Sequence, residues 1–360
     1  MTVVADLQED HGATFTERGG RQVVDHYGRP ERVHRAVRNV VGVIEMGYGV
    51  VEVTGDDRVE FVDNAVSNRV PAEDGWGVYA LLLDPQGGIE TDLYVFNAGE
   101  RLLCFVPPQR AADLAEDWSE KTFIQDVEVR AATDDFGVFG IHGPKATEKI
   151  ASVLTGPGSP DESLSFVRGT VGDWGVTVIR TDDLTGEEGY EVVCAAEDAA
   201  EVFDALVNHG LNAAPFGYRT FDYLTLEAGT PMFETELEGN VPNVLGLRNA
   251  LDFEKGCYVG QEVVSKIENR GQPSRRLVGL RPESVPTRGS AVFAGDEHVG
   301  EVTRADRSPA LDAPAAMALV DYDLAADELT VRVDGEDVPA ELADLPFVEG
   351  SARSRRLPQY

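Results

Sequence analysis

Residues 41–121 and 136–210 show the same order of predicted elements, and this repetition restricts the fold more than any other feature of the sequence. Each stretch predicts a strand, a glycine turn, a helix, an apolar hairpin and a closing helix. Gly55 and Gly143 occupy the matching turns. An antiparallel sheet with helices on one face suits this order, so we predict two similar α+β units. A chance echo within an ordinary α+β sequence is the alternative.

The two predicted hairpins begin at Trp76 and Trp174 and carry acidic residues at their tips. Asp92 lies in GGIETDL and Glu187 lies in LTGEEGYEV. Acidic tips are usually solvated, particularly in an acidic chain. Their occurrence in both halves nevertheless indicates that a ligand held between the two units would meet both carboxylates.

The sequence changes to short strands separated by turns from Arg275 onward, which predicts a C-terminal all-β barrel. We therefore predict three domains. A discontinuous α+β domain comprises residues 1–50 and 138–270, a second α+β domain comprises residues 51–137, and the barrel comprises residues 271–360.

The charge of the chain describes its solvent more than its partners. There are 64 acidic side chains against 31 basic ones, which gives a formal net charge of −33. Such a surface repels nucleic acid and anionic membranes at low ionic strength. Only five of the 31 basic side chains are lysine. An excess of acids with arginine in place of lysine is typical of a protein from a halophile. In molar salt, charges are screened within about 3 Å, so this surface would no longer repel anions at a distance. An acidic mesophilic protein is the alternative.

No stretch of the sequence predicts a membrane span, a signal peptide or a common cofactor motif. The polar N-terminus MTVVADLQEDHG favours a cytoplasmic protein. Cys104, Cys194 and Cys257 are too widely separated for a CxxC motif, and we expect no metal site. GxGxxG, a Walker A loop, HExxH and GxSxG do not occur.

The segment KGCYVGQE, residues 255–262, is the densest group of chemistry-bearing residues. Cys257 lies two residues from Lys255 and just before a predicted helix. A cation and a helix N-terminus both stabilise a thiolate, so Cys257 is a candidate reactive thiol. A small residue that fills a glycine-flanked turn is the alternative.

Arg219 begins a predicted helix in GYRTFDYLTLEAG. An arginine at this end opposes the helix dipole, which favours a role in binding an anion or a carboxylate. A surface ion pair explains the residue equally well.

These motifs together resemble the glycine-cleavage T-protein (aminomethyltransferase) superfamily, from about residue 11 to residue 347. The similarity rests on GGIETDL, LTGEEGYEV, R-x-x-x-x-L-x-L-E-A-G at residues 219–229, KGCYVGQE and HVGEVTRADRSP. KGCYVGQE in particular is similar to the signature of the YgfZ-type branch. The resemblance implies a ring-like α+β body with a central folate cavity, bound mainly by the discontinuous domain, and a C-terminal β-barrel.

The resemblance also implies roles for the hairpin residues. Glu187 would accept the adjacent N–H donors of a reduced pterin, and Asp92 would lie at the one-carbon centre near N5 and N10. Tyr79 and Arg219 would line the folate site. The superfamily's usual Asp-Asp pair is Thr91-Asp92 here, which weakens the case for T-protein chemistry more than the case for folate binding.

In the cysteine motif, Cys257 and Lys255 join Asp92 as catalytic candidates. Tyr258 and Gln261 of the same motif are expected to contact the folate.

The implied cofactor is tetrahydrofolate or a one-carbon derivative of it. The favoured hypothesis is a YgfZ-type protein that supports iron–sulfur cluster assembly or repair through Cys257, with iron–sulfur client or assembly proteins as partners. The alternative is a tetrahydrofolate-dependent aminomethyltransferase that takes its one-carbon unit from a lipoyl carrier protein. A non-catalytic scaffold that keeps the fold is the third hypothesis.

Overall fold

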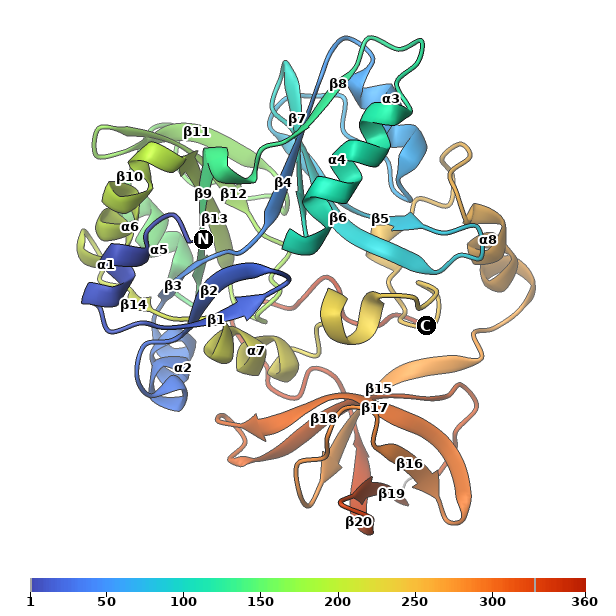
Figure 1. Cartoon of the computed structure of the whole chain (residues 1–360). Helices are drawn as coiled ribbons and strands as arrows, with labels where there is room; N and C mark the ends of the chain where they lie inside the picture. The colour runs from blue at the N-terminus through green and yellow to red at the C-terminus, as the bar shows by residue number, and fades with distance from the viewer. Residues whose placement is uncertain (1, 327) are drawn as a thin grey trace.

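The structure, a computed structural model, describes residues 2–326 and 328–360. A mixed α/β body contains two large sheets, and a closed β-barrel forms a separate unit below it (Figure 1). The predicted fold class is confirmed. At the N-terminus, helix α1 (Ala5–Asp10) precedes the two-stranded sheet of β1 (Thr14–Arg18) and β2 (Arg21–His26).

One sheet of the body has five strands in the order β5-β6-β7-β4-β8. Its elements are β4 (Gly49–Thr54), α3 (Arg58–Ala65), β5 (Trp76–Leu83), β6 (Ile89–Asn97), β7 (Arg101–Val106), η1 (Pro108–Arg110), α4 (Ala111–Glu120) and β8 (Glu128–Ala131). Helix α4 buries Leu114, Ala115 and Trp118 in the same apolar cluster as Leu93 and Val95 of β6. One face of this sheet is therefore covered by helices.

The other sheet has seven strands in the order β10-β11-β12-β13-β9-β3-β14. Its elements are β3 (Gly42–Glu45), η2 (Thr133–Asp135), β9 (Phe136–His142), α5 (Ala146–Val153), β10 (Leu154–Thr155), β11 (Phe166–Val171), β12 (Trp174–Arg180), β13 (Gly189–Ala195), η3 (Ala196–Asp198), α6 (Ala199–Asn208) and β14 (Ala214–Pro215). The pairing is antiparallel except between β3 and β14. Helices α5 and α6 cover one face of this sheet, with Ile150 and Phe203 in its apolar cluster.

The strand orders β5-β6-β7-β4 and β11-β12-β13-β9 match one another, as two similar units require. The predicted correspondence of the hairpins is nevertheless wrong by one strand. Trp76 begins β5, which corresponds to β11, whereas Trp174 begins β12. Likewise Asp92 lies on β6, whereas Glu187 lies between β12 and β13. Strand β11 (FVRGTV) has Arg168 and Gly169 between its apolar residues, and it was not predicted.

The repeated glycines Gly55 and Gly143 are required by their turns. Their φ angles are +101° and +137°, which side chains rarely adopt. A Cβ atom at Gly55 would lie 2.0 Å from the carbonyl oxygen of Asp126. At Gly143 it would lie 2.7 Å from the carbonyl oxygens of Val37 and Val40. Each glycine allows a helix to start immediately after a buried strand.

The sheet faces that the helices leave uncovered share one central apolar core. This core includes Tyr94 and Phe105 from the five-stranded sheet and Ile179 and Val193 from the seven-stranded sheet. Helices α2 (Pro30–Asn39) and α7 (Tyr218–Glu227), the π-helix η4 (Phe233–Leu237), η5 (Arg248–Ala250) and α8 (Gln261–Arg270) complete the body. Any site in this core is consequently built from distant parts of the sequence.

The barrel closes in the order β15-β18-β17-β16-β19-β20. Its strands are β15 (Arg275–Pro282), β16 (Ala291–Ala294), β17 (Glu297–Ser308), β18 (Ala313–Asp321), β19 (Glu328–Val333) and β20 (Glu336–Ala343). After β20 the chain returns from the barrel to the body and ends beside it (Figure 1). No helix among residues 2–326 and 328–360 combines the length and the apolar character that a membrane crossing requires.

Glu227, at the end of α7, joins the barrel to the body. Its Oε1 accepts hydrogen bonds from Ser308 Oγ at 2.6 Å and from the backbone N–H of Ala310 at 3.1 Å. Its Oε2 lies 2.7 Å from His34 Nε2 and 2.8 Å from Arg38 Nη2. Burial opposes ionisation, but the bonds from His34, the charge of Arg38 and the bond from Ser308 together lower the pKa of Glu227 to about 2.

We expect Glu227→Gln to lower the free energy of unfolding by about 3 kcal/mol at neutral pH, because it leaves the largely buried Arg38 without one of its two carboxylate partners. Because the pKa of Glu227 is lower in the folded state than in the unfolded chain, its ionised form stabilises the folded state above about pH 4.5. This stabilisation is lost as the pH falls toward 2. Urea unfolding of variant and wild type in the same KCl buffer should therefore converge between pH 6 and pH 3. Glu201→Gln, at an exposed position of α6, is the control, and a gap that does not depend on pH would contradict this role.

Candidate functional site

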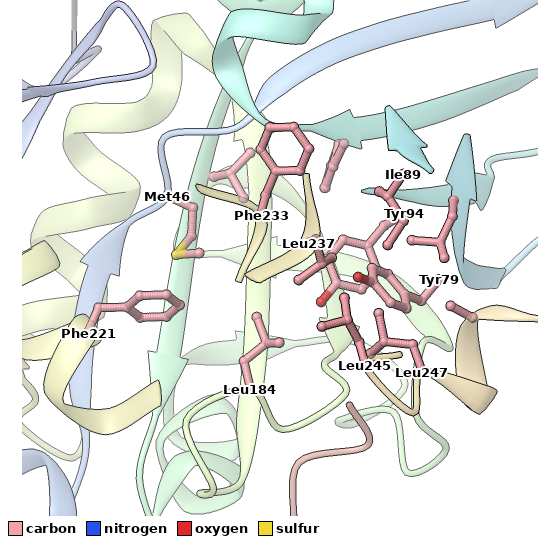
Figure 2. Packing of buried hydrophobic residues seen from close by; sticks show 14 of the residues in the cluster. Met46, Tyr79, Ile89, Tyr94, Leu184, Phe221, Phe233, Leu237, Leu245 and Leu247 are labelled. Atoms are coloured by element: carbon pink, nitrogen blue, oxygen red, sulfur yellow. The ribbon is translucent and has the colours of Figure 1, made fainter. Parts of the chain in front are cut away.

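A pocket of about 700 Å³, including its open side, lies between the inner face of the five-stranded sheet, α7 and η4, beside the segments that follow β3 and β12. Figure 2 shows Met46, Phe221 and Leu184 on one side of this region, with Tyr94 and Tyr79 opposite them. The lining comes from β1, β2, β6 and β7, from the segments that follow β3, β7 and β12, from α7, from η4 and from the C-terminal segment. A concave site where distant elements of the chain converge is typical of small-molecule binding.

Aromatic rings form much of the pocket wall. Tyr48 stacks on Phe105, with ring centroids 5.5 Å apart and planes inclined by 22°. The rings of Tyr94 and Tyr48 are nearly perpendicular, with centroids 6.3 Å apart. Tyr218 and Phe221 of α7 also line the pocket. Such walls favour a flat ring system as the ligand.

Asp92 lies at one end of the pocket because of the alternation of β6. Asp92 and Tyr94 face the central core, whereas Leu93 and Val95 face the helices. The same alternation directs Thr91 away from the pocket. The acid missing from the Asp-Asp pattern would consequently not have added a second carboxylate to this wall.

Arg356 from the C-terminal segment is buried against Asp92. Its Nη1 lies 3.0 Å from Asp92 Oδ2, and its Nε lies 3.1 Å from Asp182 Oδ2. The guanidinium carbon lies 3.7 Å from the centre of the Tyr79 ring and 5.0 Å from that of Tyr94. One buried cation thus holds two carboxylates and two rings in a fixed arrangement.

The hydroxyl groups of the two tyrosines complete this cluster. Tyr79 donates to Asp92 Oδ2 at 3.1 Å, and Tyr94 donates to Asp182 Oδ1 at 2.7 Å. Burial raises the pKa of both phenols well above the ordinary value, so both act as donors at neutral pH. Tyr79 therefore supports Asp92 from behind and is not part of the pocket lining described above. Sequence reasoning missed Arg356, Asp182 and Tyr94.

Glu187 and Glu191 of LTGEEGYEV have different environments. Glu187 accepts from Arg38 Nη1 at 2.8 Å and from the backbone N–H of Ser351 at 2.8 Å, and it does not line the pocket. Glu191 accepts from the hydroxyl of Tyr48, a lining residue, at 2.7 Å. Burial raises the pKa of Glu191 to about 7, although the bond from Tyr48 lowers it. The carboxylate nearest to the pocket in this motif is thus Glu191, which the alternation of β13 could have indicated.

Arg219 lies in a neighbouring cleft and not in the pocket. It pairs with Asp306 of the barrel at 2.9 Å, and its guanidinium carbon lies 4.8 Å from the centre of the Tyr223 ring. A surface ion pair was the alternative explanation of Arg219 in the sequence, and its contact with Asp306 is of that kind.

The cysteine motif lies beside the turn between β5 and β6, outside the pocket. A Cβ atom at Gly260 would lie 2.6 Å from the carbonyl oxygen of Asp84 in that turn. Cys257 is exposed, and Tyr258 is buried with its ring centre 5.8 Å from Lys255 Nζ. Gln261 Nε2 lies 3.5 Å from the carbonyl oxygen of Lys255.

Lys255 has a structural position. Its Nζ donates to the carbonyl oxygens of Asp63, Val66 and Asn68 at 2.6, 2.9 and 2.9 Å. The ammonium group thus fixes the cysteine motif to the end of α3, instead of being placed free beside the thiol of Cys257.

The other two cysteines, Cys104 and Cys194, are buried. Burial raises the pKa of Cys104 and of Cys194 to about 12, which keeps both thiols protonated. Among the residues that the structure describes, no three His, Cys, Asp or Glu side chains cluster as metal ligands would.

Comparison with known proteins fits this architecture. Residues 4–255 match the protein family described as "GCVT N-terminal domain", and residues 275–349 match the family described as "Glycine cleavage T-protein C-terminal barrel domain". The chain belongs to the GcvT family. The aminomethyltransferase of Saccharopolyspora erythraea is 31% identical over 98% of this chain and 99% of that protein. That of Streptomyces coelicolor is 33% identical over 93% and 94%.

A solved structure has the same GcvT fold. The glycine cleavage system aminomethyltransferase T from Bartonella henselae superposes with a TM-score of 0.86 at 24% identity, covering 98% of both chains. The predicted membership of the superfamily is confirmed. These full-length relatives are named aminomethyltransferase, which favours the alternative hypothesis over the YgfZ-type one.

We expect the stability of this GcvT-family protein to fall between pH 5 and pH 8 because of Glu191. A carboxyl whose folded-state pKa is raised to about 7 keeps a proton that the unfolded chain has lost, so stability decreases as the pH rises from about 4.5 to 7. Glu191→Gln removes this titration. The difference in unfolding free energy between variant and wild type should shift in favour of the variant by up to about 3 kcal/mol from pH 5 to pH 8.

Urea titrations at the two pH values measure this shift. Glu197→Gln, at an exposed position of η3, is the matched control and should show none. If the difference in unfolding free energy between Glu191→Gln and wild type is equal at the two pH values, Glu191 is ionised throughout this range.

Proposed function

We propose that this protein binds tetrahydrofolate in the central pocket and carries out tetrahydrofolate-dependent one-carbon transfer, as aminomethyltransferases do. GcvT-like aminomethyltransferases use tetrahydrofolate as their one-carbon carrier. The observation that carries the proposal is the Asp92 carboxylate, fixed by Tyr79 and Arg356 at one end of an aromatic pocket.

The residues of the pocket fit a reduced pterin. The ring system is flat, which suits the walls formed by Tyr48, Tyr94 and Phe105. Its adjacent N–H groups need an acceptor, and Glu191 behind Tyr48 is the carboxyl of LTGEEGYEV placed to supply one. We therefore assign to Glu191 the role that the family resemblance implied for Glu187.

Asp92 has one oxygen available for a substrate amine. Oδ2 receives the bonds from Tyr79 and Arg356, and within the described residues no hydrogen bond reaches Oδ1. In the proposed reaction Oδ1 accepts the N–H of the folate amine and orients its lone pair toward the aminomethyl carbon. As the new C–N bond forms, the C–S bond that holds the aminomethyl group to its lipoyl carrier breaks, the sulfur leaves as a thiolate, and Oδ1 takes up the proton of the amine. The pairing with Arg356 keeps Asp92 in one orientation throughout.

A lipoyl carrier protein is the proposed partner, because it would present the aminomethyl group. The name of the Bartonella henselae protein places that relative in a glycine cleavage system. We further propose a cytoplasmic, salt-adapted protein. The charge of −33 and the predominance of arginine over lysine support this setting, so the experiments below use molar KCl.

Asp92→Asn should lower the turnover of tetrahydrofolate-dependent aminomethyl transfer by at least about 100-fold, while tetrahydrofolate still binds within about tenfold of wild type. The amide keeps the shape of the carboxylate but does not accept the proton. Calorimetric titration and single-turnover assays measure the two quantities, and circular dichroism reports folding. Asp173→Asn, in an exposed turn, is the control. Wild-type protein that shows no saturable heat with tetrahydrofolate would refute the proposed function.

A YgfZ-type role in iron–sulfur cluster assembly or repair is the second candidate, and the exposure of Cys257 favours it. Cys257 lies outside the pocket, beside the β5–β6 turn that precedes Asp92 in sequence. A thiol placed there meets a partner protein more readily than it meets the folate.

Cys257→Ala separates the two candidates. On the aminomethyltransferase hypothesis the variant retains turnover within about twofold of wild type, because the thiol does not reach the pocket. On the YgfZ-type hypothesis the activities of iron–sulfur enzymes fall in cells that carry Cys257→Ala as their only copy. Asp92→Asn cells provide the comparison, and normal iron–sulfur activities with Cys257→Ala would exclude the second candidate.

A further inference from the structure

Asp182 lies behind the pocket, in the loop between β12 and β13. Its side chain is buried and does not line the pocket. The backbone carbonyl oxygen of Asp182 accepts from the N–H of Arg355 at 3.0 Å, and its Oδ2 lies 3.1 Å from Arg356 Nε. Asp182 thus holds the C-terminal segment both through its backbone and through its carboxylate. A residue in this position acts on the pocket through its neighbours and not by touching a ligand.

Arg356 divides its N–H groups between two carboxylates. Its Nε donates to Asp182 Oδ2 and its Nη1 donates to Asp92 Oδ2 at 3.0 Å, so each acid receives one bond from the guanidinium. An arginine frequently gives two parallel bonds to a single carboxylate instead. The remaining Nη2 donates to the hydroxyl of Tyr94, which in turn donates to Asp182 Oδ1 at 2.7 Å. Asp182 therefore competes with Asp92 for one cation.

The charges around this cation do not cancel. One guanidinium faces two carboxylates, which gives a net charge of −1 when both acids are ionised. Tyr79 and Tyr94 add no charge at neutral pH, because burial raises the pKa of both phenols. The neighbouring titratable group is Glu191, whose pKa is raised to about 7 by burial and further by the charge of Asp182. Asp92 thus lies in a cluster with a surplus of negative charge.

Burial preserves these interactions in high salt. The side chains of Arg356, Asp182 and Asp92 are 3%, 1% and 11% exposed. Molar salt screens exposed charges within about 3 Å, but it screens buried charges much less. The competition between the two acids for Arg356 therefore persists in the molar KCl in which we propose that the protein works.

We infer that Asp182 is a positioning residue that keeps Asp92 basic enough to take up the proton of the folate amine, an inference that rests on the proposed function. A guanidinium that served Asp92 alone would stabilise its carboxylate and make it a weaker base. Asp182 limits this stabilisation, because it takes one N–H of Arg356 and adds a second negative charge. Arg356 thereby fixes the orientation of Asp92 without abolishing its basicity.

Asp182→Asn tests this role, because it removes the second negative charge while the backbone bond to Arg355 remains. A weaker base slows proton uptake, so the single-turnover rate constant of aminomethyl transfer at pH 8 should fall about threefold, with the Kd of tetrahydrofolate within about twofold of wild type. Rapid-quench assays and calorimetry in molar KCl measure the two quantities. A weakened Kd with an unchanged rate constant overturns the inference.

Asp183→Asn is the matched control for this experiment. Asp183 is the next residue of the same loop and is also buried, but it pairs with Arg180 at 2.5 Å. Burial raises the pKa of Asp183 to about 6, so its charge too is present at pH 8. The control should keep the wild-type rate constant, and an equal fall in Asp183→Asn overturns the assignment to Asp182.

The pH dependence of the same rate constant separates a change in basicity from a loosened site. The acid limb of the profile should move down by about one pH unit in Asp182→Asn, because a weaker base is protonated only at lower pH. Glu191 titrates nearby, so the profiles are recorded in wild-type and in Glu191→Gln backgrounds, and the shift should appear in both. An unmoved limb, or a shift confined to the wild-type background, overturns the inference.

A measurement independent of turnover tests whether the two acids share Arg356. Urea unfolding at pH 7 compares Asp92→Asn, Asp182→Asn and the double variant with wild type. The double variant should raise the unfolding equilibrium constant at least about threefold more than the product of the two single effects, because only it leaves the guanidinium without a carboxylate. Additive effects overturn the sharing. Absence of saturable heat between wild type and tetrahydrofolate refutes the proposed function itself, whereas the outcome of this cycle does not depend on folate.

Discussion

The site depends on one buried guanidinium, that of Arg356. It lies between Asp92 and Asp182 and against the rings of Tyr79 and Tyr94. A buried cation is tolerated only when carboxylates and hydrogen bonds replace its water, and removal of one partner leaves the others uncompensated. The five groups therefore form a single unit. Since Arg356 is provided by the last residues of the chain, the pocket is complete only after the C-terminal segment has returned to the body.

That return is fixed in part by Glu187, which the sequence predicted to bind the ligand. Glu187 holds the backbone N–H of Ser351, and the backbone of Glu227 accepts from Val348 at 3.1 Å. Arg355 N–H donates to the carbonyl oxygen of Asp182 at 3.0 Å. The acids of the motifs LTGEEGYEV and LEAG thus build the support of the site, and a motif can be functional without each acid in it touching the substrate.

Sequence periodicity predicted the two sheets, the barrel and the approach of Asp92 to a shared interior, because local alternation decides which face of a strand is apolar. It could not predict Arg356, which meets Asp92 across 264 positions of sequence. Nor could it place Lys255, whose ammonium group points into the backbone around Val66. The offset of the two units arose because β11, with Arg168 and Gly169 between its apolar residues, has no clear strand pattern without its neighbours. Long-range pairing and burial of charge are settled by tertiary packing alone.

The distribution of charge explains how a ligand would be oriented. At the inner end, Asp92 and Asp182 share one guanidinium, and Glu191 lies nearby with its pKa raised to about 7 by burial. This end needs N–H donors and has no cation to spare for an anion. At the outer end the arginines are neutralised by acids as well. A molecule with an N–H-rich ring and a carboxylate tail would enter ring first, because only the ring meets complementary groups and the tail keeps its water. Orientation then follows from electrostatics, and Asp92 is the acid that the ring must reach.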